Sequence, residues 1–291
     1  MNYIKKYWRE TTFISIVIQL IVILFVIMLF SILYRWVTVQ STYTSSLPYK
    51  TQLEKHGVVL IHNVLSKQDI ENLKKYASND NIIDAKKYIV NSYSIKSIIN
   101  NLLDKDYIFQ DYIFLIKRSQ FHTCHRDYNG DLYNETQKHP SYTILFYLDE
   151  MEKCLDVLPQ SHLTREHDYN LTDYTQTVYC RAGDAILFNA NLVHNGSLNE
   201  DDKHMRIQMK VSHRSDLKTL EFYNKYNKIL NVDSNDTMIF KRLQKHVTCQ
   251  FPILSNYIKQ YDKNNADNNT QNEPTSSFFS SLFPKLKTVV E

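Results

Sequence analysis

Two histidines and one aspartate occur in an order that could build a single iron site. His125 and Asp127 lie two positions apart at the end of an extended apolar run, so both side chains point to one face of a strand. His194 follows a second apolar run far downstream. Two imidazoles and one carboxylate leave coordination positions open, an arrangement that suits non-haem Fe(II) oxygenases. We therefore predict that these three residues are both the metal ligands and the catalytic centre.

A fourth residue, Arg206, could bind an acidic co-substrate. It opens a third extended run, residues 206–211, and its guanidinium presents a forked pair of donors that matches a carboxylate. Lys210 and Arg214 are the rival anchors. Lys210 lies an even number of positions from Arg206, so it shares the same strand face.

The other histidines and the nearby cysteine have simpler interpretations. His122 precedes His125 by an odd number of positions, so it falls on the opposite strand face. His162 belongs to a loop and is expected to bond the backbone, and Cys124 is interpreted as a small buried residue. No partner of matching spacing exists for His204 or His213. The sequence contains no His-Glu-x-x-His motif, which argues against a zinc protease.

The elements that must position these residues are a few helices followed by many short strands. A capping box at residues 66–69 begins one helix, and residues 95–103 have the apolar spacing of a second. From residue 107 the pattern becomes strand-like. Expected strands cover residues 58–61, 107–116, 142–148, 177–180, 185–188 and 206–212, and helical patterns return over residues 217–230 and 238–261. This order predicts a mainly β fold with flanking helices, built on a double-stranded β-helix, that is, a cupin-like jelly roll.

An uncharged apolar run over residues 13–33 precedes this region. As a helix it would be about 30 Å long, enough to cross a bilayer. It exceeds the apolar core of a cleaved signal peptide, which is roughly 7–15 residues, although a signal peptide and a buried soluble helix are the alternatives. We predict an uncleaved transmembrane anchor over residues 13–34. The basic residues before it, Lys5, Lys6 and Arg9, favour a cytosolic N-terminus and a lumenal or exterior catalytic region.

Composition and charge restrict the classes of binding partner that we expect. The formal net charge is +3, and no long basic run occurs, so we expect no nucleic-acid partner. Four cysteines allow two bridges in three pairings, or none. The predicted organisation is a short cytosolic segment (1–12), the anchor (13–34), a linker (35–52), the jelly-roll domain (53–215), a C-terminal helical extension (216–262) and a disordered polar tail (263–291).

From about residue 53 to residue 214 the chain resembles the phytanoyl-CoA dioxygenase-like family of Fe(II)/2-oxoglutarate dioxygenases. Residues 57–66 look like the family's opening strand and helix, and residues 114–117 are similar to its approach to His125 and Asp127. Leu158-Pro-Gln-Ser-His162 is similar to its Pro-Gly-Ser-His segment, with Gln160 where a glycine is usual. Residues 183–188, followed by His194 and Arg206, are similar to its distal part.

The resemblance implies a concrete chemistry. His125, Asp127 and His194 would hold Fe(II), with 2-oxoglutarate as co-substrate and ascorbate as a reductant. Arg206 would pair with the C5 carboxylate of 2-oxoglutarate, helped by a hydroxyl such as that of Ser197. The retained carboxylate of Asp127 favours a hydroxylase over a halogenase.

Two function classes follow from these residues. The first is a membrane-anchored hydroxylase that couples 2-oxoglutarate decarboxylation to substrate oxidation. The second is a non-catalytic, membrane-tethered jelly-roll module that has kept the fold for binding. The intact ligand set and arginine favour the enzyme, because a binding module needs no such combination. The substrate class stays open: a lumenal domain suits protein side chains or glycans, and a membrane tether suits a lipid-like molecule.

Overall fold

The computed structural model describes residues 2–38, 41–118, 123–127, 137–163, 175–199, 204–223, 225–231 and 237–250. The chain divides into two compact units, residues 1–39 and residues 40–291. The first unit contains helix α1 (Asn2–Thr38). Its stretch Ile14–Tyr34 has a mean hydropathy of 3.2 and is long and apolar enough to cross a membrane, although a signal sequence would have the same properties.

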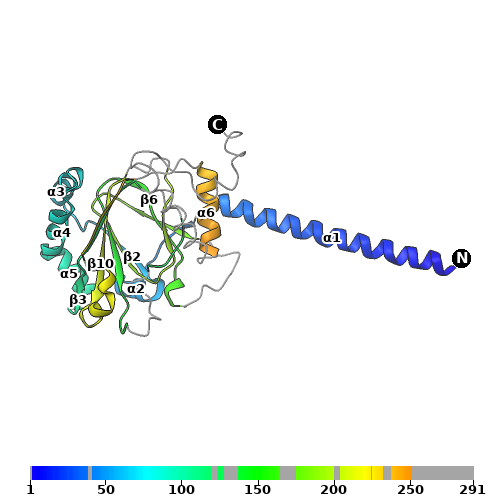
Figure 1. Ribbon diagram of the computed structural model, residues 1–291, viewed down its shortest axis with the longest axis horizontal. Helices are drawn as coiled ribbons and strands as arrows, with labels where there is room; N and C mark the ends of the chain where they lie inside the picture. Colours follow the sequence, from blue (N-terminus) through cyan, green and yellow to red (C-terminus); the bar gives the residue numbers. More distant parts are fainter. Residues whose placement is uncertain are drawn as a thin grey trace. The chain divides into compact units, whose positions relative to one another are not determined.

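The second unit is built on two sheets (Figure 1). The larger has the strand order β11-β4-β10-β5-β8-β2, with β3 paired to β10, and the smaller has the order β1-β7-β6-β9. The strands are β1 (Ser41–Thr42), β2 (Val58–Ile61), β3 (Tyr107–Phe109), β4 (Tyr112–Arg118), β5 (Tyr142–Tyr147), β6 (Met151–Val157), β7 (Gln176–Cys180), β8 (Ala185–Asn189), β9 (His194–Gly196), β10 (Arg206–His213) and β11 (Tyr226–Asn231). This mainly β architecture agrees with the predicted jelly-roll-like core.

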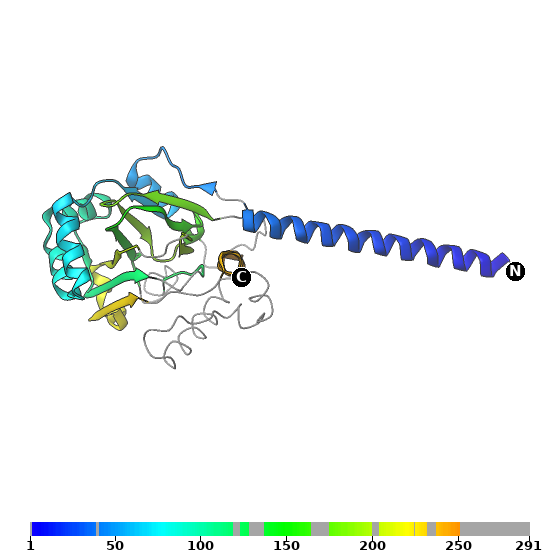
Figure 2. The same ribbon diagram turned by 90° about the horizontal axis from the view of Figure 1, so that it is seen from above.

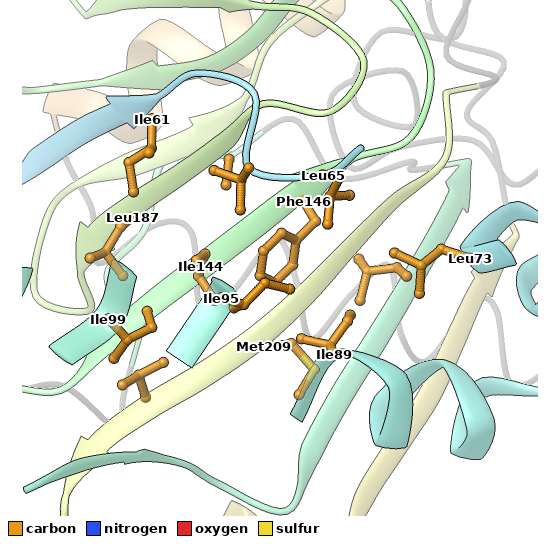
Figure 3. Packing of buried hydrophobic residues seen from close by; sticks show 14 of the residues in the cluster. Ile61, Leu65, Leu73, Ile89, Ile95, Ile99, Ile144, Phe146, Leu187 and Met209 are labelled. Carbon is orange, nitrogen blue, oxygen red and sulfur yellow. The ribbon is translucent and has the colours of Figure 1, made fainter. Parts of the chain in front are cut away.

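Helices flank the sheets (Figures 1 and 2). They are α2 (Tyr49–His56), α3 (Lys67–Ser78), α4 (Ile82–Asn91), α5 (Tyr93–Leu102) and α6 (Met238–Gln250), with the 3-10 helices η2 (Ser161–Leu163) and η3 (Arg214–Tyr223). The Ser66 side chain caps α3 and Asp69 completes the capping box that the sequence predicts. Helices α3, α4 and α5 pack their apolar faces on one face of the larger sheet, where Leu73, Ile89 and Ile95 meet strand residues (Figure 3).

The long apolar runs of the central strands are explained by burial on both faces. In β5, Ile144 and Phe146 pack against the helices, whereas Leu145 and Tyr147 belong to the core shared with the smaller sheet. Successive side chains of a strand point to opposite faces, so a central strand needs apolar residues at nearly every position. The same division applies to β8.

Strand β10 differs, because only one of its faces is apolar. Ile207 and Met209 join the core on the helix side. Arg206, Gln208 and Lys210 therefore point to the opposite face, toward the space between the two sheets. Antiparallel pairing with β5 sets Arg206 opposite Tyr147 and Lys210 opposite Thr143. Polar side chains inside the fold at this point mark the candidate site.

Several boundaries differ from the sequence prediction. Residues 41–56, mostly expected to be linker, form β1 and α2, and β1 pairs in parallel with β7. The expected strand over residues 107–116 is split into β3 and β4. The helix expected over residues 217–230 is wrong in its second half, because β11 forms there and pairs in parallel with β4. The tail 263–291 and the end of the 238–261 helix lie outside the described residues.

Candidate metal centre

The backbone brings the two predicted histidine ligands together. The His125 N–H donates to the His194 carbonyl at 2.9 Å, and the His194 N–H donates to the His125 carbonyl at 3.0 Å. This reciprocal pair places the two ring centroids 4.5 Å apart. Asp127 is fixed in the same way, because its N–H donates to the Ala190 carbonyl at 2.7 Å. Main-chain hydrogen bonds therefore hold His125 and Asp127 to the segment that leads into β9, and β9 begins with His194.

Hydrogen bonds also fix which nitrogen of each imidazole faces the site. The Nδ1 atom of His125 lies 2.9 Å from the Thr123 carbonyl, and that of His194 lies 2.9 Å from the Leu192 carbonyl. A carbonyl only accepts, so both Nδ1 atoms donate, and the Nε2 atom of each ring is the one left to face the site. This is the arrangement that a metal-binding histidine needs.

The Nε2 atoms face the carboxylate of Asp127. Its Oδ1 atom lies 3.8 Å from Nε2 of His125 and 3.9 Å from Nε2 of His194. The three ligand atoms lie within 4.8 Å of one another. Two imidazole nitrogens and one carboxylate oxygen at this spacing fit an iron ion with open coordination positions.

The second oxygen of Asp127 has partners that the sequence analysis did not assign. Thr143 donates its hydroxyl to Oδ2 at 2.7 Å, and the Lys210 ammonium donates to the same atom. Burial acts to raise the pKa of Asp127, but Lys210, His194 and His125 together lower it well below the ordinary value. Burial lowers the pKa of Lys210, although the Asp127 carboxylate acts in the opposite direction. Asp127 is thus held as a charged carboxylate whose Oδ1 atom faces the two imidazoles.

The proposed anchor Arg206 lies beside the strand that carries His194. A Cβ atom built on Gly196 would lie 3.3 Å from Nη2 of Arg206, so the missing side chain gives the guanidinium room. The Tyr147 and Ser197 hydroxyls are buried and have no hydrogen-bond partner within the described structure. Tyr147 is the cross-strand neighbour of Arg206, whereas Ser197 directly follows Gly196. The Tyr147 and Ser197 hydroxyls are thus unused donors among the described residues of this part of the fold.

The expected loop histidine behaves as predicted. Nε2 of His162 lies 3.0 Å from the Glu54 carbonyl, and the side chain is buried. Gln160, at the position where the family usually has glycine, has a φ of 71°. That left-handed conformation is the one that glycine adopts without strain. His122 lies outside the described residues.

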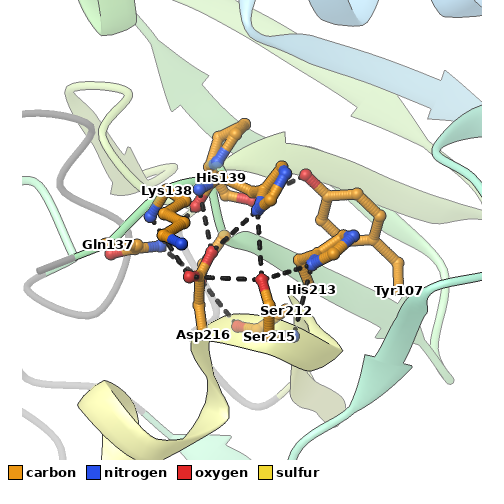
Figure 4. A network of polar contacts seen from close by, with 10 residues as sticks. Tyr107, Gln137, Lys138, His139, Ser212, His213, Ser215 and Asp216 are labelled. Carbon is orange, nitrogen blue, oxygen red and sulfur yellow. Dashed lines mark hydrogen bonds and ion pairs between the residues drawn. The ribbon is translucent and has the colours of Figure 1, made fainter.

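A second polar cluster joins the segment before β5 to the end of β10 (Figure 4). The His139 and His213 rings stack with centroids 3.8 Å apart. The Asp216 carboxylate accepts hydrogen bonds from the backbone N–H groups of Lys138 and His139. His213 thus has a partner that its sequence spacing did not reveal, because that partner comes from a distant segment. These contacts tie the two segments together.

A disulfide and a hydrogen bond join helix α6 to the segment that carries His125. Cys124, which directly precedes His125, is bridged to Cys249 of α6, and its N–H donates to the Thr248 hydroxyl at 2.9 Å. The other two cysteines, Cys154 and Cys180, form a second bridge. All four cysteines are therefore paired, and Cys124 is buried as the sequence analysis expected.

Comparison with known protein families gives one match. Residues 95–207 match the family model of phytanoyl-CoA dioxygenase (PhyH). With the fold and ligand set above, the match defines the class as an Fe(II)/2-oxoglutarate-dependent oxygenase. Within that class, residues 95–207 are similar to the phytanoyl-CoA dioxygenase family. Its cofactors are accordingly iron and 2-oxoglutarate. No curated protein sequence matches the chain.

Solved structures show distant similarity. The non-haem alpha-ketoglutarate-dependent epimerase SnoN from nogalamycin biosynthesis is 15% identical, covering 57% of this chain and 82% of its own, with a TM-score of 0.47. AviO1 from Streptomyces viridochromogenes Tue57 is 16% identical, covering 58% and 96%, with a TM-score of 0.46. EvdO2 from Micromonospora carbonacea var. aurantiaca, solved with 2-oxoglutarate, is 15% identical, covering 60% and 92%, with a TM-score of 0.44. The assignment to the class of Fe(II)/2-oxoglutarate-dependent oxygenases rests on the family model and not on these structures.

Proposed function

We propose that this oxygenase is a membrane-anchored hydroxylase whose iron is held by His125, Asp127 and His194. The observation that carries the proposal is the convergence of two imidazole nitrogens and one carboxylate oxygen within 4.8 Å of one another. Iron bound there with 2-oxoglutarate supplies the oxidising chemistry, coupled to decarboxylation to succinate. The protein orients the ligands and excludes water.

Arg206 is the proposed anchor for the C5 carboxylate of 2-oxoglutarate. Its forked donors would receive that carboxylate with the help of the Ser197 hydroxyl, which is buried and unpaired among the described residues. The buried Tyr147 hydroxyl, across from Arg206, is a further donor. A buried hydroxyl without a hydrogen-bond partner destabilises the fold, and a bound carboxylate would supply the missing partner.

The proposed location is a single-pass membrane protein with a cytosolic N-terminus and a lumenal or exterior catalytic unit. The apolar stretch Ile14–Tyr34 supports the anchor. Lys5, Lys6 and Arg9 before it support the orientation. Two disulfides add support, because such bonds persist mainly in oxidising compartments. In that compartment, protein side chains or glycans are the proposed substrates, with a lipid-like molecule as the alternative that the anchor favours.

The test is a turnover assay on the full-length chain in detergent with Fe(II), ascorbate and labelled 2-oxoglutarate. We expect succinate to form slowly alone and faster with the correct substrate, presented as peptide, glycan or lipid panels. Hydroxylated product should accumulate in step with succinate. Stimulated succinate without an added oxygen atom in the product would contradict the hydroxylase assignment. A complete absence of succinate would favour the non-catalytic binding module.

A further inference from the structure

The two oxygens of Asp127 have separate partners. Oδ1 faces the Nε2 atoms of both histidines at 3.8 and 3.9 Å. Oδ2 accepts from the Lys210 ammonium and from the Thr143 hydroxyl. Lys210 also donates to the Thr143 hydroxyl oxygen at 2.7 Å, which closes a three-membered network on the side of the carboxylate away from the imidazoles.

This network is built into the sheet. Lys210 of β10 and Thr143 of β5 are direct cross-strand partners, so their side chains leave the sheet side by side. Only 2% of the Lys210 side chain is exposed. Removing a lysine from water is costly unless it is paired and hydrogen-bonded, and here the pairing is with a proposed metal ligand. A purely apolar side chain at position 210 would have filled the same core without that cost.

We propose that Lys210 is a positioning residue that, with Thr143, makes Asp127 bind the metal through one oxygen only. The inference rests on the proposed metal centre. With Oδ2 held by an ammonium and a hydroxyl, only Oδ1 is available, so the carboxylate cannot chelate through both oxygens. One more coordination position then stays open for the co-substrate.

The same contact limits how tightly the site binds a metal. The ammonium offsets the charge of the carboxylate and repels a nearby divalent cation. Replacing it with an uncharged side chain should therefore strengthen metal binding, while freeing Oδ2 to occupy a position needed by 2-oxoglutarate. A lysine that merely stabilised the fold would produce neither of these opposite effects.

The experiment is an anaerobic titration of the full-length chain in detergent with Co(II) alone, followed by 2-oxoglutarate on the Co(II)-loaded protein. For Lys210→Met we expect about tenfold tighter Co(II) binding, about 1.4 kcal/mol. We also expect an altered visible absorption spectrum of the bound ion and at least about tenfold weaker 2-oxoglutarate binding. Weaker Co(II) binding with an unchanged spectrum would overturn the proposal.

A matched control is a second buried lysine–aspartate pair among the described residues, Lys245 and Asp156, joined at 3.0 Å. Lys245→Met also removes a buried cation and should leave the Co(II) spectrum unchanged. Equal spectral and affinity changes in both variants would overturn the specific role of Lys210.

A second variant keeps the proposal testable if Lys210→Met does not fold. Thr143→Val removes one hydrogen bond to Oδ2 and retains the ammonium. It should change the Co(II) spectrum in the same direction by a smaller amount, and an unchanged spectrum would overturn the proposal. Failure of the unmodified protein to bind Co(II) would instead overturn the metal centre itself.

Discussion

Arg206 and Lys210 lie on the same face of β10, yet their surroundings assign them different tasks. Lys210 is engaged by Asp127, whereas the Arg206 guanidinium lies beside Gly196. Sequence spacing alone could place both residues on one face but could not choose between them. The difference comes from the neighbours of each side chain: Asp127 contacts Lys210, and Gly196 lies beside Arg206. Sequence spacing does not show these contacts, because the Asp127–Lys210 pair joins residues far apart in the chain.

Arg206→Lys should raise the apparent KM for 2-oxoglutarate by about tenfold or more. Lysine keeps the charge but loses the fork, and a hydrogen bond to a charged group is worth about 1.5–3 kcal/mol, at about 1.4 kcal/mol per decade. Arg206→Ala should have a larger effect. Steady-state kinetics would measure KM, and iron content should stay near one ion per chain in both variants. An unchanged KM in Arg206→Ala would show that another residue is the anchor.

The ligand residues themselves could be predicted because their chemistry is local. The alternation of an extended chain predicts that a histidine and an aspartate two apart share a face. Residues 123–127 form no regular strand, however, and His125 pairs with His194 only through an isolated bridge. The structure then brings His194 to them, as predicted. The Oδ2 partners of Asp127 were not predictable in this way, because Thr143 and Lys210 carry no motif and reach the carboxylate only through sheet pairing.

At the scale of elements, segments with a strong hydrophobic periodicity form the predicted strands, whereas segments with a weak one do not. The expected strands over residues 142–148 and 185–188 correspond closely to β5 and β8. β9 was missed because it has only three residues and its pairing with β6 is entirely long-range. The sequence of β11 has apolar residues at helical spacing, but the segment pairs in parallel with β4, and this pairing outweighs the local preference.

Gln160→Gly should stabilise the loop between β6 and η2. A side chain in the left-handed region costs roughly 1–2 kcal/mol, and part of this gain is lost to the greater freedom of glycine in the unfolded chain. The Gln160 side chain is exposed, so few contacts are removed. We expect a net gain of about 0.5–1 kcal/mol by urea unfolding. Gln160→Ala, which keeps the Cβ atom, is the control and should give no gain.

Acidification should loosen helix α6. Burial lowers the pKa of His246 to about 3, and Lys245 and Arg242 add to the effect. A lowered pKa means that the unfolded chain takes up the proton first, so stability is present above about pH 6.5 and is lost as the pH falls toward 3. Between these pH values the free energy of unfolding should fall by up to about 1.4 kcal/mol per pH unit.

This prediction can be checked by unfolding the protein at a series of pH values. His246→Gln should flatten the loss of stability between pH 6.5 and 5, where few carboxylates titrate. Identical pH profiles for the variant and the unmodified protein would show that His246 does not titrate on unfolding.

At the scale of the whole molecule, the apolar stretch of α1 should keep the protein in the membrane. A spanning helix resists high salt and alkaline carbonate, whereas a surface-bound helix is released. Fractionation of membranes would show the chain in the pellet after both washes. In sealed microsomes, the catalytic unit should be protected from external protease. Complete digestion from outside would contradict the lumenal placement.

The most direct test of the metal centre is the iron content of the purified protein and of Asp127→Ala, measured together with succinate formation. Asp127 supplies the only charged ligand of the three, so its loss should leave two imidazoles that cannot retain the ion. We expect close to one ferrous ion per chain in the unmodified protein, and neither iron nor succinate above background in the variant. Iron content and succinate formation that survive Asp127→Ala would show that His125, Asp127 and His194 are not the iron site.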